Sequence, residues 1–168
     1  MSIKSISLNE FLINPINLWK NDWFLLTSGN FDQGKYNTMT VAWGSIGLMW
    51  NKPFVQVVVR PTRYTYEFME KYETFTLSAF PEKYRPALNL LGTKSGRNCN
   101  KILESGLTPI KSTIVQAPSF AEAELIFECK KLYWQDFDPK NFLDSSIERN
   151  YPQKDYHRIY FGKILASL

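Results

Sequence analysis

Residues 36–47, YNTMTVAWGSIG, have the pattern of a β-strand in the middle but not at either end. The branched and aromatic residues at the centre of the stretch suit a pleated sheet. Asn37 and Thr38 place an amide and a hydroxyl before them, and Gly44 and Gly47 follow. The stretch is either a polar strand start followed by a hairpin turn, or a segment shaped around a ligand, with glycines for a bend or a close backbone approach.

The composition predicts one folded domain, residues 1–168, large enough to bury about two thirds of its unfolded surface. Hydrophobic residues make up 44% of the chain, which predicts a packed core and excludes a disordered class. Aromatic residues, at 15%, can fill that core and also supply flat faces for a planar ligand. The net charge of +4 suits an anionic small ligand as well as nucleic acid. The sequence has no long run of like charges, so we expect no nucleic-acid-binding tail.

Metal and export signals are missing from the sequence. Cys99 and Cys129 are the only cysteines, and they have no zinc-ligand spacing with histidine or with each other. The first residues lack the apolar run of a signal peptide, and no stretch is long and apolar enough to span a membrane. We therefore expect no metal, no membrane association and a cytoplasmic protein.

The periodicity along the chain predicts a strand-rich fold. Alternating or continuous apolar runs predict six strands, with a β-bulge near Lys130 and Lys131 where the apolar phase slips by one residue. Shorter segments predict helices, the first of them with Thr65 as its N-cap. Such a pattern is typical of a closed or nearly closed barrel with helical decoration. The predicted strands are residues 23–29, 37–50, 54–60, 74–80, 121–134 and 157–165; the predicted helices lie within 65–72, 81–92 and 96–106.

Residues 60–71, RPTRYTYEFMEK, combine cations, hydroxyls and a helix start. Arg60 and Arg63 lie beside Thr62 and Thr65, and a helix N-terminus offers free N–H groups and partial positive charge. This combination can bind a phosphate. A solvated turn with a threonine cap explains the same spacing equally well.

Other candidate sites have simpler explanations. Residues 92–101, GTKSGRNCNK, could enclose an anion, but an ordinary basic surface loop is favoured. His157, the only histidine, is interpreted as a structural residue near a strand start. Glu122 and Glu124 share one strand face, which predicts a solvated surface and not a catalytic pair. No dinucleotide-binding GxGxxG, P-loop or GxSxG motif occurs.

The order of these motifs resembles the flavin reductase-like family, and within it the flavoredoxin branch. The resemblance rests on N-x-M-T-x-x-W-G, a following apolar strand, R-x-x-R-Y-T, FTLSAF and GTKSGR with Lys101, and it covers roughly residues 10–165. It implies a mainly β fold: a six-stranded antiparallel Greek-key split barrel with short flanking helices. It also implies a homodimer that binds FMN near the subunit interface.

Carried over by motif, the resemblance assigns cofactor-binding residues. The isoalloxazine and ribityl would be lined by Asn37, Thr38, Met39, Thr40 and Trp43. The phosphate would be held by Arg60, Thr62, Arg63, Tyr64 and Thr65, with Lys94 near the ring or the phosphate. No general acid or base is implied, because hydride chemistry belongs to the cofactor. Residues 136–155 match nothing specific in the family.

The expected function is hydride transfer from NADH or NADPH to FMN, with electrons passed on to free flavin, a redox partner protein or oxygen. FMN is favoured over FAD because only one phosphate-binding cluster is visible. One alternative is an electron carrier of the flavoredoxin type without its own reductase step. A barrel that binds single-stranded nucleic acid and a purely structural dimer module are further alternatives. We expect no nucleic-acid partner, because the strand faces do not interleave lysine with aromatic residues.

Overall fold

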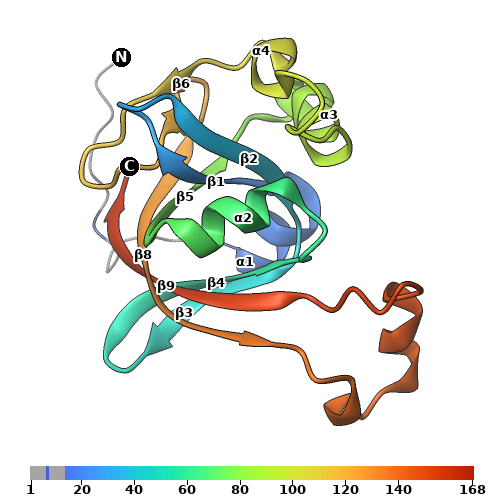
Figure 1. Ribbon diagram of the computed structural model, residues 1–168. Helices are drawn as coiled ribbons and strands as arrows, with labels where there is room; N and C mark the ends of the chain where they lie inside the picture. The colour runs from blue at the N-terminus through green and yellow to red at the C-terminus, as the bar shows by residue number, and fades with distance from the viewer. Residues whose placement is uncertain (1–6, 8–13) are drawn as a thin grey trace.

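The computed structural model describes residue 7 and residues 14–168. Seven antiparallel strands form one strongly curved sheet in the order β2-β1-β5-β8-β9-β4-β3, so β2 and β3 are its two edges (Figure 1). A second sheet contains two short strands, β6 and β7. The strands are β1 (Phe24–Asn30), β2 (Lys35–Val41), β3 (Gly44–Met49), β4 (Lys52–Val59), β5 (Thr74–Ala79), β6 (Pro109–Ile110), β7 (Ser119–Phe120), β8 (Leu125–Asp136) and β9 (Arg158–Ser167).

The mainly β split-barrel prediction is confirmed, but the expected strand over residues 37–50 is two strands. The chain leaves β2 at Val41 and starts β3 at Gly44, on the opposite edge of the sheet. A Cβ at Gly44 would lie 2.3 Å from the Gln56 carbonyl oxygen and from the Trp19 ring. Gly44 therefore permits a close backbone approach where the chain crosses between the edges. The main sheet has one strand more than predicted for this reason.

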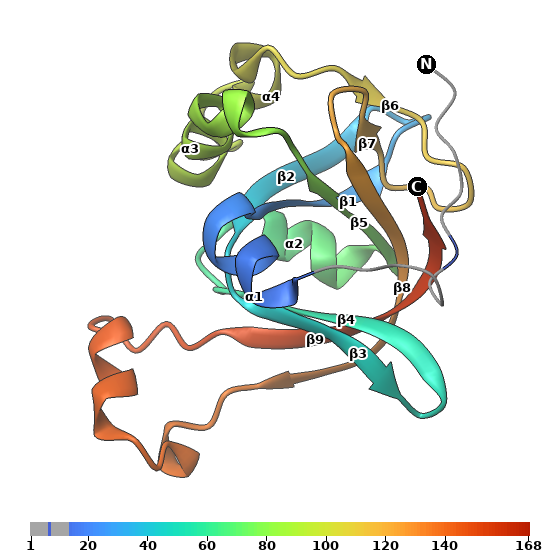
Figure 2. The same cartoon turned by 180° about the vertical axis from the view of Figure 1, so that it is seen from behind.

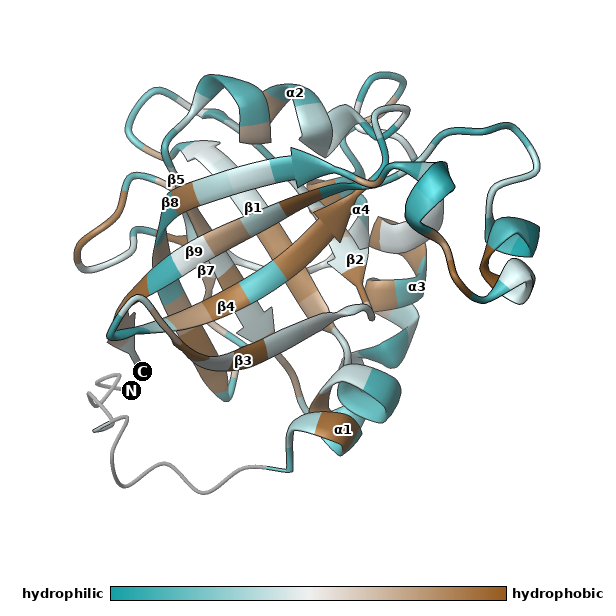
Figure 3. Ribbon diagram, turned by 90° about the horizontal axis from the view of Figure 1, so that it is seen from below, coloured by the Kyte–Doolittle hydropathy of each residue, from teal (hydrophilic) through white to brown (hydrophobic). Residues whose placement is uncertain are grey.

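Rings and branched side chains fill the barrel interior. Phe24, Phe75, Phe127 and Tyr160 are fully buried there, and hydrophobic positions predominate along β4 (Figure 3). β4 is buried on both faces, as its continuous apolar run predicts. A second cluster, around Phe120, packs outside the sheet against the helices that follow β5.

The helices are short and lie around the barrel. α2 lies between the β1–β2 and β4–β9 sides of the barrel in both views (Figures 1 and 2). The helical segments are α1 (Pro15–Asn17), η1 (Leu18–Asp22), α2 (Tyr64–Lys71), η2 (Glu82–Tyr84), α3 (Arg85–Thr93), α4 (Lys101–Ser105), η3 (Pro139–Asn141) and η4 (Ser145–Asn150).

The predicted N-cap of α2 was wrong. Arg63 is the cap residue, with an extended backbone and no side-chain cap bond. Thr65 lies in the first turn, is buried, and its hydroxyl accepts a hydrogen bond from the Asn37 amide at 2.8 Å. The hydroxyl is therefore turned towards β2 and away from the helix's own N–H groups.

The bulge in β8 is where the sequence predicts it. The pairing of β8 with β9 shifts between Glu128 and Cys129 and again between Lys131 and Tyr133. Beyond this irregular region, residues 137–157 leave the barrel as a projecting arm that carries η3 and η4 (Figures 1 and 2).

Candidate functional site

Three segments that the sequence singled out meet beside β2. The Asn37 amide donates to Thr65 at the start of α2. The Thr40 hydroxyl donates to the Leu88 carbonyl of α3 at 2.5 Å. A Cβ at Gly96 would lie 2.3 Å from the Asn37 side-chain oxygen, so the glycine lets the loop after α3 press against the strand.

A small cavity of about 70 Å³ lies between these segments. Its walls combine cations with hydroxyls and contain no carboxylate. The lining residues are Met39, Thr62, Arg63, Tyr64, Thr65, Thr93, Lys94, Ser95 and Lys101. The structure thus brings together Met39 from the strand, the turn before α2 and Lys94 from the glycine-containing loop.

Two cations give this cavity its charge. Lys101 is only 3% exposed, and its Nζ donates to the Leu91 carbonyl at 2.8 Å. Burial, and then the charge of Arg63, lower the pKa of Lys101 to about 8. Burial also lowers the pKa of Arg63, followed by the charge of Arg60, and the Arg63 guanidinium donates to the Gly92 carbonyl.

Neither Arg63 nor Lys101 has a carboxylate partner among residues 14–168. Charges removed from water are normally paired, because desolvation is costly. The cavity also lies at the start of α2, whose N-terminus has no side-chain cap. An anion bound here would compensate both cations and use the helix N-terminus.

Two further cations are already neutralised: Lys94 in the cavity wall and Arg97 beside it. Lys94 pairs with Glu104 at 2.5 Å, and the hydrogen bond to that carboxylate raises the pKa of Lys94. Arg97 pairs with Glu67 at 2.6 Å and also donates to the Thr62 carbonyl. The unpaired positive charge is therefore concentrated at Arg63 and Lys101.

Five of the sequence-predicted site residues do not line this cavity. Asn37 and Thr40 hydrogen-bond to α2 and α3, and the other three are Thr38, Arg60 and Trp43. The Thr38 side chain is fully buried between strands, where its hydroxyl donates to the Leu26 carbonyl. Arg60 pairs with Asp155 of the arm at 2.7 Å. Trp43 is 49% exposed in the connection between β2 and β3, with its ring 5.4 Å from that of His157. Thr38 could therefore contact a ligand only through its backbone. Arg60 and Trp43 instead connect the barrel to the arm.

Comparison with known proteins identifies the family. The profile of the flavin reductase-like domain matches residues 21–166. The chain belongs to the flavin reductase-like family. An uncharacterised protein of Pyrococcus abyssi is 29% identical over 149 residues, which span 85% of this chain and 70% of the relative.

Solved structures share the fold of this flavin reductase-like chain. The FMN-binding domain of a flavin reductases-like enzyme from Shewanella baltica has a TM-score of 0.70 at 19% identity, covering 98% of this chain and 75% of its own. Flavoredoxin of Desulfovibrio vulgaris has a TM-score of 0.68 at 23% identity, with coverages of 98% and 76%. The NADH:FAD oxidoreductase SgcE6 of Streptomyces globisporus has a TM-score of 0.65 at 14% identity, with coverages of 88% and 74%.

The single histidine of this flavin reductase-like domain has a well-satisfied environment. His157 is buried among rings at the base of the arm, and its Nδ1 is 2.8 Å from the Tyr151 hydroxyl. Burial, and then the charge of Arg60, lower the pKa of His157 to about 4. The imidazole is therefore neutral at physiological pH, in agreement with its interpretation as a structural residue.

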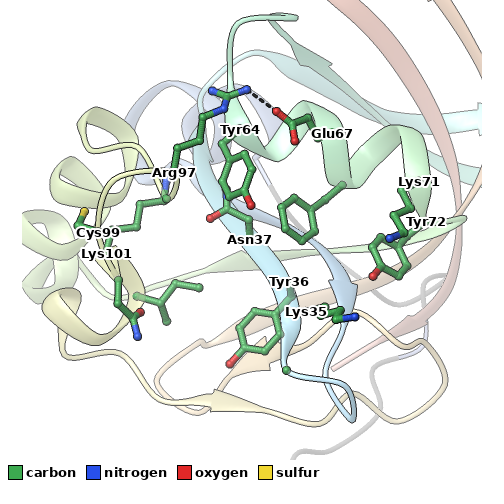
Figure 4. Close-up of a pocket in the computed structure, with 15 residues that line it drawn as sticks. Lys35, Tyr36, Asn37, Tyr64, Glu67, Lys71, Tyr72, Arg97, Cys99 and Lys101 are labelled. Atoms are coloured by element: carbon green, nitrogen blue, oxygen red, sulfur yellow. Dashed lines mark hydrogen bonds and ion pairs between the residues drawn. The ribbon is translucent and has the colours of Figure 1, made fainter.

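Sequence reasoning missed the buried cation of the site and an adjoining pocket. Lys101 was noted only as part of a motif, because a lysine after Asn100 reads as an exposed helix start. A pocket of about 650 Å³ adjoins the small cavity and shares Tyr64 and Lys101 with it (Figure 4). Asn37 also lines this pocket. The four-residue spacing of Tyr64, Phe68 and Tyr72 is the feature of the sequence that could have indicated this pocket.

Within residues 14–168, no group of histidine, cysteine or carboxylate side chains could hold a metal ion. No helix in the described ranges is long and apolar enough to cross a membrane.

Proposed function

We propose that this protein is an FMN-dependent oxidoreductase that takes hydride from NADH or NADPH and passes electrons to an acceptor. The observation that carries the proposal is the pair Arg63 and Lys101, two buried or half-buried cations at a cavity without a carboxylate. A terminal phosphate monoester fits this donor set, because it is compact, doubly charged and rich in acceptor oxygens. Family membership supports FMN as the molecule that carries the phosphate.

In this proposal, several cavity residues bind the phosphate, each through a different kind of contact. Arg63 would supply a planar fork of donors and Lys101 a point charge. The hydroxyls of Thr62 and Ser95 line the same cavity and can donate to the remaining oxygens. Tyr64 and Thr65 would contribute from the first turn of α2, and Lys94 would contribute from the loop, beside its partner Glu104.

The flavin ring is assigned to the free edge of β2. An edge strand presents unpaired backbone N–H and C=O groups, which can bind the polar edge of a heterocycle. Met39 borders the phosphate cavity, and the half-exposed Trp43 lies two residues beyond the end of the strand at Val41. Asn37, Thr38 and Thr40 hold the strand in shape through their hydrogen bonds.

When bound, FMN supplies the ring that accepts hydride and releases electrons. The chain's tasks are then to bind, to orient and to stabilise negative charge with nearby N–H groups and cations. No general acid or base is required for these tasks, and we assign none.

An electron carrier without its own reductase step is the second candidate. Flavoredoxin of Desulfovibrio vulgaris, which shares the fold, supports it. Purified protein loaded with FMN would be mixed with NADH and then NADPH under anaerobic conditions. Bleaching of the flavin absorption by either nucleotide supports the reductase. A flavin that stays oxidised with both, yet accepts electrons from dithionite, refutes the reductase and leaves the carrier.

We also propose a homodimer located in the cytoplasm. Large apolar side chains exposed on the described surface support an interface; they include Trp43, Leu48, Trp50, Trp134 and Leu143. Light scattering is expected to give twice the chain mass of 19.6 kDa, and a monomer with FMN bound would refute the dimer. A redox partner protein remains part of the proposal, and no nucleic acid is expected to bind.

A further inference from the structure

A sizeable pocket lies between α2, β2 and the loop before α4. Its volume is about 650 Å³, within the range of pockets that hold small organic ligands. Figure 4 shows Tyr64, Glu67, Lys71 and Tyr72 on the α2 side and Cys99 and Lys101 on the opposite side, with Lys35, Tyr36 and Asn37 from β2 between them. We call it the α2 pocket.

One side of the α2 pocket is a row of aromatic rings. Tyr64 and Phe68 lie four residues apart on one face of α2, and Tyr72 follows after four more residues, directly after the helix ends. The Tyr64 and Phe68 rings meet edge to face at 5.1 Å, and the Phe68 and Tyr72 rings lie nearly parallel at 6.2 Å. All three line the pocket and remain partly exposed. Rings left at the surface in a concave row offer stacking faces to a flat ligand.

The rim of the α2 pocket carries positive charge that the protein does not neutralise. Lys35 and Lys71 are exposed and have no ion pair with any described residue. Lys101 reaches the pocket from α4 and also has no carboxylate partner. Glu67 lines the pocket but is occupied by Arg97. The pocket therefore combines stacking faces with an excess of cations.

The α2 pocket adjoins the phosphate cavity, with which it shares Tyr64 and Lys101, but it lies away from the position assigned to the flavin ring. It contacts β2 at residues 35–37, whereas the phosphate cavity contacts the strand at Met39 and the ring edge continues towards Trp43. At about 3.3 Å per residue, Asn37 and the end of β2 at Val41 lie roughly 13 Å apart, and Trp43 follows two residues beyond. A flavin extending from the cavity towards Trp43 leaves the α2 pocket free.

We propose that the α2 pocket binds a nucleotide, with its base against the aromatic row of α2 and its phosphate at Lys35 and Lys71. This site is additional to the proposed FMN site, and its occupation does not depend on FMN. A free mononucleotide and the mononucleotide half of a dinucleotide present the same chemistry to the pocket.

Calorimetric titration of the full chain with AMP, with and without saturating FMN, tests the proposal. We expect saturable binding of one AMP per chain in both conditions. Adenosine, which lacks the phosphate, and ribose 5-phosphate, which lacks the base, are each expected to bind at least tenfold more weakly. CMP, GMP and UMP are titrated in parallel to measure the preference for the base.

Charge reversal provides a matched pair of variants. Lys71→Glu is expected to weaken AMP binding at least tenfold and to leave FMN binding unchanged. Lys83→Glu is the control. Like Lys71, Lys83 is exposed and lies over the ring of the next tyrosine; the distances to the ring centroids are 5.1 Å for Lys83 and 5.7 Å for Lys71. Unlike Lys71, Lys83 does not line the pocket.

Three results would overturn the proposal: no binding of any of the four mononucleotides at millimolar concentration, loss of AMP binding when FMN is added, or equal effects of Lys71→Glu and Lys83→Glu. Titration with NADH identifies the source of the nucleotide. Displacement of NADH by AMP assigns the pocket to the adenylate of a dinucleotide, and independent binding assigns it to a free mononucleotide. AMP binding that persists when FMN fails to bind would refute the proposed flavin function and support this site.

Discussion

Replacing Arg63 by alanine tests whether this arginine serves to bind a ligand or to stabilise the fold. The guanidinium is half buried, its pKa is lowered by burial and by Arg60, and its donor contact is the Gly92 carbonyl. No described carboxylate compensates it. In the free protein this charge is therefore a cost, and with a bound phosphate it becomes a charge-assisted hydrogen-bond donor.

The expected magnitudes differ for binding and for folding. A charge-assisted hydrogen bond contributes about 1.5–3 kcal/mol. Its loss in Arg63→Ala raises the Kd for FMN by roughly 10- to 150-fold, at about 1.4 kcal/mol per factor of ten. The free energy of unfolding changes by less than about 1 kcal/mol, because the lost bond to Gly92 is offset by relief of desolvation and of repulsion from Arg60.

Fluorescence titration of FMN and urea unfolding of the apoprotein measure the two quantities. Arg63→Lys, which keeps the charge but not the planar fork, is expected to give an intermediate Kd. Arg97→Ala is the matched control, because Arg97 is already paired with Glu67, and its Kd should change less than about threefold. An unchanged Kd for Arg63→Ala, or a loss of several kcal/mol of stability with it, would refute the reasoning.

Three further predictions concern titration and buried polar groups. The affinity for FMN should fall as the pH rises above about 8, because Lys101 then loses its proton, and calorimetry of Lys101→Met should show this dependence abolished. The stability of the protein should fall as the pH drops from about 6.5 towards 4, because His157 binds a proton more readily in the unfolded chain than in the folded one. Thermal unfolding of His157→Gln should show a shallower fall of stability with pH, and a fall as steep as that of the unmutated protein would contradict the lowered pKa of His157. Glu128→Gln should lower the free energy of unfolding in urea by about 2 kcal/mol or more, because the buried carboxylate accepts four hydrogen bonds from residues 113–115 and an amide can accept only some of them. A decrease below about 0.5 kcal/mol would contradict this prediction.

The strands were predictable because their signal is local. Alternation along β5, the continuous apolar run of β4 and the phase slip in β8 each depend on neighbouring residues, and each prediction agrees with the structure. The break after Val41 was not predictable. Trp43 suits a strand by type, and the requirement for Gly44 comes from the Gln56 carbonyl, a partner twelve residues away across the sheet.

The site was predictable as a set of segments but not as a geometry. The turn before α2 and the loop after α3 carried visible phosphate-binding chemistry. Lys101 gave no such signal, because its burial depends on how α3 and α4 pack. The spacing of Tyr64, Phe68 and Tyr72 is visible in the sequence, but whether such a row faces a core or a pocket depends on tertiary structure.

The central claim is that Arg63 and Lys101 bind the phosphate of a flavin mononucleotide. The most direct measurement compares the Kd values of FMN and riboflavin, which differ only in the phosphate, for the protein and for Arg63→Ala. We predict that FMN binds at least tenfold more tightly than riboflavin and that most of this difference is lost in Arg63→Ala. Equal affinities for the two flavins, or no binding of either, would contradict the claim.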